Sequence, residues 1–248
     1  MAYDVFSEFY DSLTDNVEYE KRAEYFCRLL SAYGQKNGIL LDLACGTGSM
    51  AVLMAQKGYD VIGVDYAVGM LNAAREKAME AGQNILLLCQ PMEELDLFGT
   101  VDCCISVLDS INHLPDAHAV KSAFAGVSLF MNPGGVFLFD VNTIYKHREV
   151  LGSNAFVYEN EDLFCAWQNT FHPEDNSVDI TLDFFSEQED GAWLRSYEEF
   201  SEQAYPLEDI ARWLEESGFD VKGIYEDMTT DPVTPETQRA VFAAVKRK

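Results

Sequence analysis

The sequence predicts an α/β fold with parallel strands, and three observations lead to that prediction. Short apolar, strand-like runs alternate with segments of helical spacing over the first 150 residues and again after residue 206. The chain has 248 residues, 48% of them hydrophobic, which suits one large domain or one domain with an insertion. No internal repeat or low-complexity tract suggests a solenoid or a tandem array.

The first elements follow in regular order. Residues 19–33 have helical spacing of apolar side chains, and Gly34 is placed to end that helix. From Ile39 the pattern is strand, glycine turn and helix (about 48–57). Strands alternating with helices in this way form a parallel sheet with helices on both faces. The other elements expected before residue 150 are strands at 59–65, 84–89, 101–107 and 135–141 and helices at about 67–81 and 117–131.

The pattern changes after residue 150. Four segments alternate apolar and polar residues and are separated by turn sequences such as HPEDNS and QEDG, which is typical of an antiparallel meander. A helix between Pro206 and Gly218 and two strands at about 219–226 and 239–246 complete the chain. We therefore expect one domain made of residues 1–150 and 207–248, and an inserted antiparallel β subdomain at 151–206. Its expected strands are 155–160, 163–172, 177–187 and 192–205.

The chain is strongly acidic, with 42 Asp and Glu against 17 Lys and Arg and a formal net charge of −25. Such a surface repels nucleic acid, and bases cluster only in the final KRK, so no nucleic-acid partner is expected. Solubility is the simpler explanation of this acidity. A preference for an amine or another cation is the sharper one, because residues 151–206 contain 13 acids and one base, Arg195.

No apolar run approaches the roughly 18 to 20 residues that a membrane span needs. The N-terminal sequence MAYDVFSEFYDSL carries acids where an export signal carries bases, so a cytoplasmic location without membrane contact is expected. The six cysteines form no C-x-x-C pair, and the four histidines form no H-x-x-x-H pair. Buried thiols and no metal site are therefore expected, while the oligomeric state stays open.

The most informative stretch is LLDLACGTGSMA, residues 40–51. Gly46 and Gly48 let the backbone approach a ligand closely, and the helix behind them offers unpaired N–H groups. With Ala51 they satisfy the dinucleotide pattern G-x-G-x-x-A, and Asp65 stands where a ribose-binding acid belongs. NAD fits this pattern. Asp42, a charge inside an apolar strand, has no place in it and needs a partner.

LLDLACGTG resembles the first motif of the class I S-adenosylmethionine-dependent methyltransferases. Later motifs of that family are matched in order by YAVGML (66–71), LLCQPMEEL (87–95), VLDSINHL (107–114) and NPGGVFLFDVN (132–142). The resemblance implies a Rossmann-like three-layer sandwich whose seven-stranded sheet is mostly parallel, with an antiparallel last strand. It implies S-adenosylmethionine as cofactor and a small-molecule substrate as methyl acceptor. The stretch 151–206 resembles the insertion of small-molecule methyltransferases, including sugar N-methyltransferases, which would cover the acceptor site.

The resemblance also implies roles for single residues. Asp42 would hold the amino end of the methionine part, and Asp65 would bind both ribose hydroxyls. Tyr66 and Met70 would contact the adenine. Gln90 stands where the family often has an acid, so Gln90 or the backbone would meet the adenine amino group. The cofactor-binding set expected in full is Tyr10, Asp42, Ala44, Cys45, Gly46, Gly48, Asp65, Tyr66, Met70, Gln90, Met92 and Leu108.

Asp109, Asn112 and His113 follow the fourth strand and are the candidate catalytic residues. Methyl transfer is a displacement at carbon, so the enzyme mainly aligns the acceptor, and a base is needed only if the acceptor must lose a proton early. His113 is the candidate general base, with a structural hydrogen-bonding role as the simpler interpretation. Trp167, Trp193 and Tyr197 could line the acceptor pocket, although packing within the sheet is the simpler role.

Two alternatives stay open. An NAD-dependent oxidoreductase accepts the same glycine turn, but no Tyr-x-x-x-Lys pair occurs in the chain. A protein of the same fold that binds the cofactor and only regulates a partner is the other alternative.

Overall fold

Two separate sheets form the framework of the molecule. The structure is a computed structural model that describes residues 10, 13–14, 17–159, 163–188 and 190–248. Its larger sheet has seven strands in the order β10-β11-β5-β4-β1-β2-β3. The strands are β1 (Gly38–Leu43), β2 (Tyr59–Asp65), β3 (Leu86–Cys89), β4 (Val101–Ser106), β5 (Met131–Asn142), β10 (Phe219–Glu226) and β11 (Arg239–Lys246).

The direction of the strands confirms the predicted fold class. β1 runs parallel to β2 and β4, and β5 runs parallel to β4. β11 runs antiparallel to both β5 and β10, so the last strand is inverted. This is the seven-stranded, mostly parallel sheet of a Rossmann-like α/β fold.

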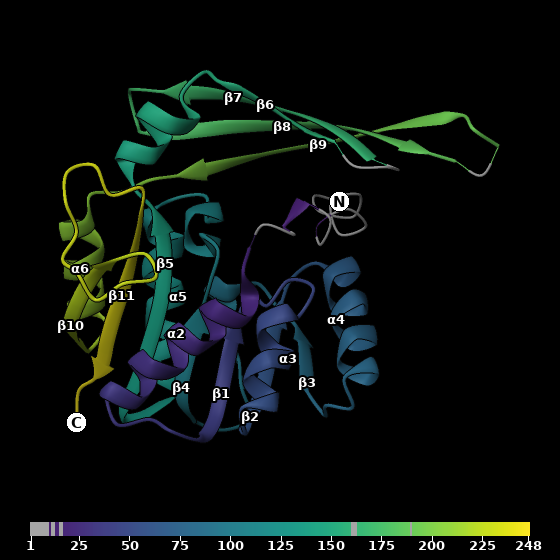
Figure 1. The fold of residues 1–248 in the computed structure, drawn as a ribbon. Coiled ribbons are helices and arrows are strands. Elements are labelled where there is room, and N and C mark those ends of the chain that lie inside the picture. The colour runs from purple at the N-terminus through teal and green to yellow at the C-terminus, as the bar shows by residue number, and fades with distance from the viewer. Residues whose placement is uncertain (1–9, 11–12, 15–16, 160–162, 189) are drawn as a thin grey trace.

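Helices cover both faces of this sheet (Figure 1). On one face, Tyr25 and Phe26 of α2 (Tyr19–Ala32) and Met54 of α3 (Ser49–Gln56) pack in one core with strand residues such as Leu40. On the other face, Phe124 of α5 (Ala117–Phe130) and side chains of α6 (Leu207–Glu216) form a second core. α4 (Val68–Glu80) lies beside α3 at the β2–β3 edge. Among the described helices, none is both long and apolar enough to cross a membrane.

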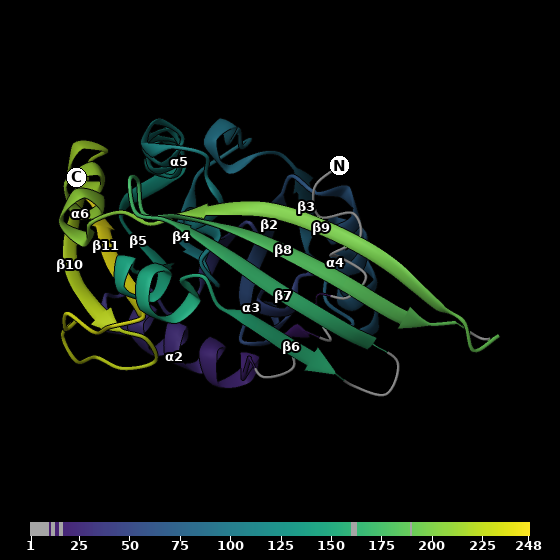
Figure 2. The ribbon, with the colours of Figure 1, turned by 90° about the horizontal axis from the view of Figure 1, so that it is seen from above.

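The second sheet has four antiparallel strands in sequence order: β6 (Ala155–Glu159), β7 (Leu163–His172), β8 (Ser177–Glu187) and β9 (Trp193–Gln203). Val178, Ile180, Leu182 and Phe184 alternate along β8 and are buried in its core. Figures 1 and 2 show this sheet lying across one end of the larger sheet and extending beyond it as a long hairpin. It lies within residues 151–206; that this segment is a separate subdomain stays a prediction.

Two differences from the predicted elements have physical reasons. β5 begins at Met131, four residues before the predicted start, because Met131 already pairs with Val101 ahead of an irregularity in the register. Three short helical segments were not predicted: 3₁₀ turns at Met92–Glu94 and Ser110–His113, and a π-helical segment at Lys146–Leu151. Segments of three to six residues are too short to display a helical period.

Candidate functional site

The turn after β1 has an unusual backbone that needs its glycines. Ala44, Gly46 and Gly48 have φ values of 59°, 54° and 78°, in the left-handed region. A Cβ added at Gly46 would meet no atom within 4 Å, whereas one at Gly48 would lie 2.8 Å from the Cβ of Ala74. Gly46 therefore leaves open space, and Gly48 allows α4 to pack closely against the turn.

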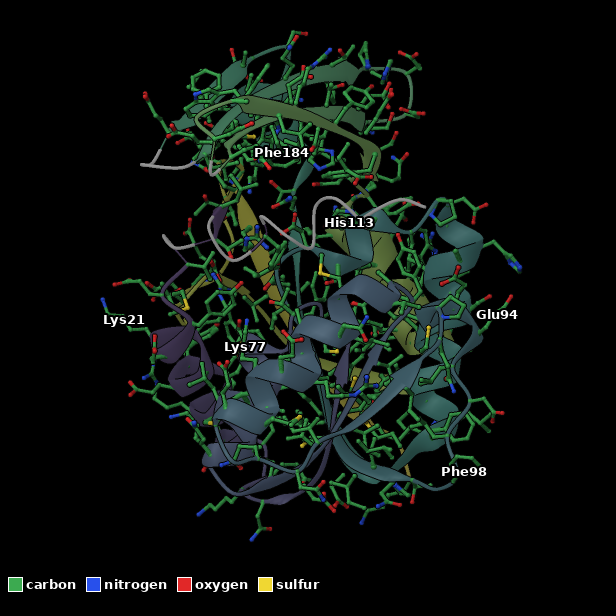
Figure 3. The ribbon with its side chains drawn as sticks, turned by 90° about the vertical axis from the view of Figure 1, so that its right-hand side faces the viewer. Lys21, Lys77, Glu94, Phe98, His113 and Phe184 are labelled. Carbon is green, nitrogen blue, oxygen red and sulfur yellow. The ribbon has the colours of Figure 1, made fainter. Side chains whose placement is uncertain are left out.

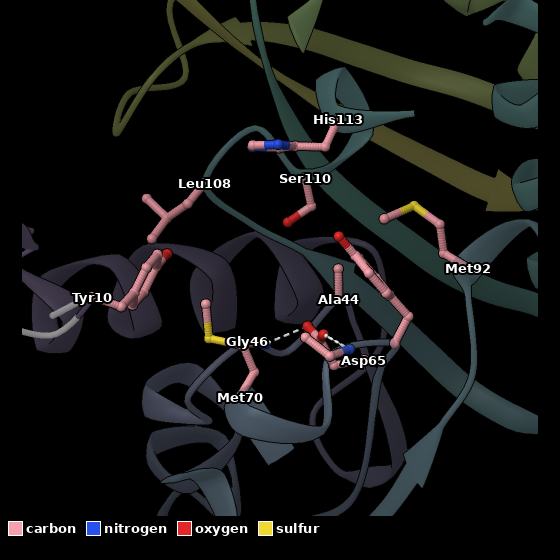
Figure 4. Close-up of a pocket in the computed structure, with 11 residues that line it drawn as sticks. Tyr10, Ala44, Gly46, Asp65, Met70, Met92, Leu108, Ser110 and His113 are labelled. Atoms are coloured by element: carbon pink, nitrogen blue, oxygen red, sulfur yellow. Dashed lines mark hydrogen bonds between the residues drawn. The ribbon is translucent and has the colours of Figure 1, made fainter. Parts of the chain in front are cut away.

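Asp65 ends β2 and closes the same turn. Its Oδ2 accepts a hydrogen bond from the Gly46 N–H and its Oδ1 accepts one from the Ala67 N–H, both at 2.9 Å (Figure 4). Burial raises the pKa of Asp65, and these N–H groups oppose that rise. Because a carboxylate oxygen can accept a second hydrogen bond, Asp65 is fixed in position yet still able to bind hydroxyl groups.

A first cavity opens where β1, β2 and β4 end, with His113 opposite Asp65 (Figure 4). A smaller space next to it adds Tyr19, Cys45, Thr47, Ser49, Met50 and Val107. Nine of the twelve expected cofactor residues line these two spaces. The first cavity is lined by Tyr10, Ala44, Gly46, Asp65, Tyr66, Ala67, Met70, Met92, Leu108, Ser110 and His113.

The other three expected cofactor residues lie elsewhere. Gly48 packs against Ala74, as described above. Gln90 donates from Nε2 to the Asp96 carbonyl at 2.9 Å and accepts from the Asp96 N–H at 3.0 Å, so its amide closes its own loop. Asp42 is fully buried, and in the described part of the chain its carboxyl oxygens have no hydrogen bond of normal geometry, although the Ala51 N–H acts on them to lower its pKa. Burial and the charge of Asp65 raise the pKa of Asp42 to about 7.

The turn after β4 is held by a buried acid of β5. Leu108 and Asp109 have φ values of 58° and 55°, which residues other than glycine rarely adopt. The Leu108 N–H donates to Oδ2 of Asp140 at 3.0 Å, and the Asp109 N–H donates to Oδ1 at 2.7 Å. Asp140 is fully buried and forms ion pairs with Arg22 and Arg239. This support fixes the direction in which Asp109 points.

A second cavity lies between the two sheets, and it shares Tyr10, Leu108 and His113 with the first. Its lining divides into an apolar part and a polar part. The apolar part consists of Leu13, Val17, Leu151, Tyr158, Trp167, Leu182 and Phe200; the polar part includes Asp109, His113, Asn142, Lys146, Glu202 and Arg239.

The polar part is a connected network centred on Asn142, which ends β5. The Asn142 Nδ2 donates to Asp109 Oδ2 at 2.7 Å and to Glu202 Oε2 at 2.9 Å, and its Oδ1 accepts from Lys146 Nζ at 2.9 Å. Arg239 pairs with Asp109 at 2.7 Å. Burial, and the nearby charge of Arg239, lower the pKa of Lys146. Asn142 thus joins acids of both sheets at one place.

Glu202 of β9 brings the second sheet to His113. Its carboxylate lies 4.0 Å from His113 Nε2 and 3.3 Å from Nε2 of the buried His147. Burial would raise the pKa of Glu202, but the hydrogen bond with His147 and the neighbouring His113 lower it below its usual value. Figure 3 shows His113 between the layers of the larger sheet and the sheet that carries Phe184.

The three expected catalytic residues have different surroundings. Asp109 and His113 line the second cavity. Asn112 is buried, with Nδ2 donating to the carbonyls of Asn142 and Gln203 and Oδ1 accepting the Asn142 N–H. Asn112 therefore ties the turn to β5 and β9, and its contact with an acceptor stays a prediction.

Of the three aromatic residues that could line the acceptor pocket, one does so. Trp167 lines the second cavity, whereas Trp193 and Tyr197 are about half exposed and are absent from its lining among the described residues. Of the described acids between residues 151 and 206, Glu202 alone lines the cavity. The overall acidity of that segment is therefore a poor guide to its ligand.

Sequence reasoning did not identify Asn142, Lys146, Glu202 and Arg239 as site residues. Glu202 left a signal, because it alternates with the apolar Phe200 and Ala204 on one face of the chain. An acid at such a position needs a buried partner.

Known proteins resemble this chain over part or all of its length. A family model described as a methyltransferase domain matches residues 40–135. A Geobacillus sp. (strain WCH70) protein named as a methyltransferase is 31% identical over 247 residues, covering 99% of this chain and 100% of its own. A ubiquinone biosynthesis O-methyltransferase of Bordetella avium (strain 197N) is 34% identical over 102 residues, covering 40% of this chain and 41% of its own.

Two solved structures share the fold over the whole chain. An S-adenosylmethionine-dependent methyltransferase from Clostridium acetobutylicum ATCC 824 has a TM-score of 0.89 and 29% identity, with 99% of each chain covered. The sugar N-methyltransferase KedS8 from Streptoalloteichus sp. ATCC 53650 has a TM-score of 0.80 and 20% identity, with 100% of this chain and 94% of its own covered. These similarities decide between the two cofactors that fit the glycine turn: the chain belongs to the class I S-adenosylmethionine-dependent methyltransferases.

Proposed function

We propose that this enzyme transfers the methyl group of S-adenosylmethionine to an amine nitrogen of a small molecule, with His113 as general base. The observation that carries the proposal is the position of His113, which lines both cavities and so stands between a donor in the first and an acceptor in the second. The net negative charge of the chain disfavours nucleic acid as the methyl acceptor. We also propose that the reaction takes place in the cytoplasm.

The lining of the first cavity supports the cofactor-binding part of the proposal. Asp65, fixed by two backbone N–H groups, would bind the ribose hydroxyls, and Met70, Met92 and Tyr66 would surround the adenine. The open space at Gly46 accommodates a ligand against the backbone. Asp42, a buried carboxyl without a hydrogen bond of normal geometry to the described residues, would be left for the amino end of the methionine part, as the family resemblance implies.

A base next to the acceptor matters for only some acceptors. When bound, the cofactor supplies a methyl group made electrophilic by its sulfonium. A protonated amine must lose a proton before its nitrogen can attack and a hydroxyl must also lose a proton, whereas a carboxylate needs no base. His113 therefore favours an amine or a hydroxyl over a carboxylate.

Two carboxylates of the second cavity, which lie beside the cations Lys146 and Arg239, support an amine over a hydroxyl. A neutral amine gains positive charge as it is methylated, and fixed carboxylates stabilise such charge. Asp109 and Glu202 both line the cavity, and each is held in place by Asn142. KedS8 shares the fold over all of this chain, inserted sheet included, and is an N-methyltransferase by name, which supports the same acceptor class.

The proposal can be tested with S-adenosylmethionine carrying a deuterated methyl group and sets of acceptors that differ only in bearing an amine, a hydroxyl or a carboxylate. Mass spectrometry should find the label on the amines. His113→Gln should lower kcat by about 100-fold, the usual contribution of a general base, and should change the Kd of S-adenosylhomocysteine far less. Labelling of hydroxyl or carboxylate compounds alone would exclude the amine, and a wild-type kcat in the variant would exclude the base.

A further inference from the structure

β9 of the inserted sheet places two side chains against His113. The ring centroids of Phe200 and His113 are 5.2 Å apart, and Oε1 of Glu202 lies 4.0 Å from His113 Nε2. Glu202 is only 4% exposed. A carboxylate is rarely buried unless its oxygens are bound, so the contacts of this side chain indicate what it is held for.

The second oxygen of Glu202 is bound on two sides. Asn142 Nδ2 donates to Oε2 at 2.9 Å, and His147 Nε2 lies 3.3 Å from the same oxygen. The Nδ1 of His147 lies 3.0 Å from the Asn176 carbonyl oxygen. The fully buried His147 thus links Glu202 to the Asn176 carbonyl, while Asn142 binds the same carboxylate oxygen.

The remaining ionisable groups around His113 have other contacts. Asp109 binds Arg239 and Asn142, and Lys146 binds Asn142. Asp65 faces the ring across the first cavity and holds the glycine turn. Three tyrosines also line the cavities among the described residues: Tyr10 on both, Tyr66 on the first and Tyr158 on the second. Oε1 of Glu202 is thus the carboxylate oxygen that the fold directs at His113.

We propose that Glu202 is the positioning residue of His113: His147 and Asn142 fix its carboxylate so that it stabilises the imidazolium that His113 becomes on taking the acceptor's proton. This rests on the proposed function. The nitrogen–carbon bond forms as the carbon–sulfur bond breaks, and sulfur keeps the bonding electrons. The proton passes from the acceptor nitrogen to His113 and then to water. The inserted sheet would therefore take part in proton transfer as well as covering the acceptor.

Glu202→Gln tests this role, because glutamine keeps the shape of the side chain and removes its charge. We expect kcat to fall about tenfold and the KM for S-adenosylmethionine to stay unchanged. The acid limb of the kcat/KM profile should move to lower pH by about one unit, since a base without its carboxylate partner is protonated less readily. Glu202→Asp should restore part of that shift, and the Kd of S-adenosylhomocysteine should match the wild type in every variant.

Glu198→Gln is the matched control, because Glu198 lies on the same face of β9 and is 7% exposed. It should leave the acid limb in place. An unmoved acid limb in Glu202→Gln, or an equal shift in Glu198→Gln, would contradict the positioning role. Failure of the proposed function is distinguishable: His113→Gln with wild-type kcat would remove the base itself, whereas loss of activity in that variant with an unmoved limb in Glu202→Gln would contradict Glu202 alone.

Discussion

The first and second cavities are built in different ways. The first depends on local backbone geometry: a left-handed turn at residues 44–48 and an acid at the end of the next strand, which holds that turn by a hydrogen bond. The second depends on side chains from distant segments, with Asn142 joining Asp109 to Glu202 across two sheets. A binding site for a common cofactor can therefore be encoded in a short motif, whereas the acceptor site is created by the fold.

This difference predicts that substitutions in the two cavities will have different effects. Changes in the first cavity should alter the affinity for cofactor, and changes in the inserted sheet should alter acceptor KM and pH dependence. Any variant that changes both strongly would show that the two cavities are coupled through the residues they share, Tyr10, Leu108 and His113.

The largest effect is expected for Asp42→Asn. The folded-state pKa of Asp42 is raised to about 7, against about 3.9 in an unfolded chain. A raised carboxyl pKa gives stability that is fully present below pH 4 and is lost as pH rises to about 7. The loss amounts to about 4 kcal/mol at most. Asparagine cannot ionise. Between pH 4.5 and 8, the free energy of unfolding of the cofactor-free variant should therefore rise relative to that of the wild type by up to that amount.

Urea denaturation at the two pH values measures this gain. Saturating S-adenosylhomocysteine should reduce it at pH 8, because the amino end of the ligand would then compensate the charge of Asp42. Equal pH dependence in both proteins would show that Asp42 ionises as readily in the folded as in the unfolded state.

The next largest effect is expected for Asp65→Ala, which also tests the local design of the first cavity. The change removes a proposed ribose partner and leaves the Gly46 and Ala67 N–H groups without their acceptor. Charged hydrogen bonds contribute about 1.5 to 3 kcal/mol each, so the Kd of S-adenosylhomocysteine should rise about 100-fold by calorimetry. Asp60→Ala, at an exposed position of the same strand, should leave it unchanged. A rise of less than threefold in Asp65→Ala would place the ribose elsewhere.

The same contrast explains what could be predicted from the sequence. Periodicity and glycine positions are local, so β2, β7, β8, β10 and β11 were predicted at their observed bounds. The turn at Gly46 and the acid at Asp65 were equally visible. Nothing local distinguishes Asn142 or Arg239 from other polar residues at strand ends. They become site residues only because β11 inserts next to β5, which brings Arg239 opposite Asn142.

The buried networks also corrected one line of reasoning. The 13 acids of residues 151–206 suggested a cation-binding cover, yet Glu202 is the one described acid of that segment that lines the cavity. Total charge records composition, whereas the role of an acid depends on which face of its strand it occupies.

The smallest effect is expected for Trp167→Ala, and it bears most directly on whether the inserted sheet binds the acceptor. Trp167 lines the second cavity, is held by a hydrogen bond of 2.6 Å from Nε1 to Asn169 Oδ1, and contacts Phe156 at 6.0 Å between ring centroids. Loss of such an aromatic wall should raise the acceptor KM about tenfold, or about 1.4 kcal/mol, and leave the Kd of S-adenosylhomocysteine unchanged.

Trp193→Ala provides the matched control, because Trp193 is 51% exposed on β9 and belongs to the same sheet. Initial-rate kinetics should give it the wild-type acceptor KM. Equal KM values in the two variants would mean that the sheet affects the acceptor only through its overall stability. A higher KM in Trp167→Ala alone would instead show direct contact, because both variants lose the same side chain from the same sheet and differ in whether it faces the cavity.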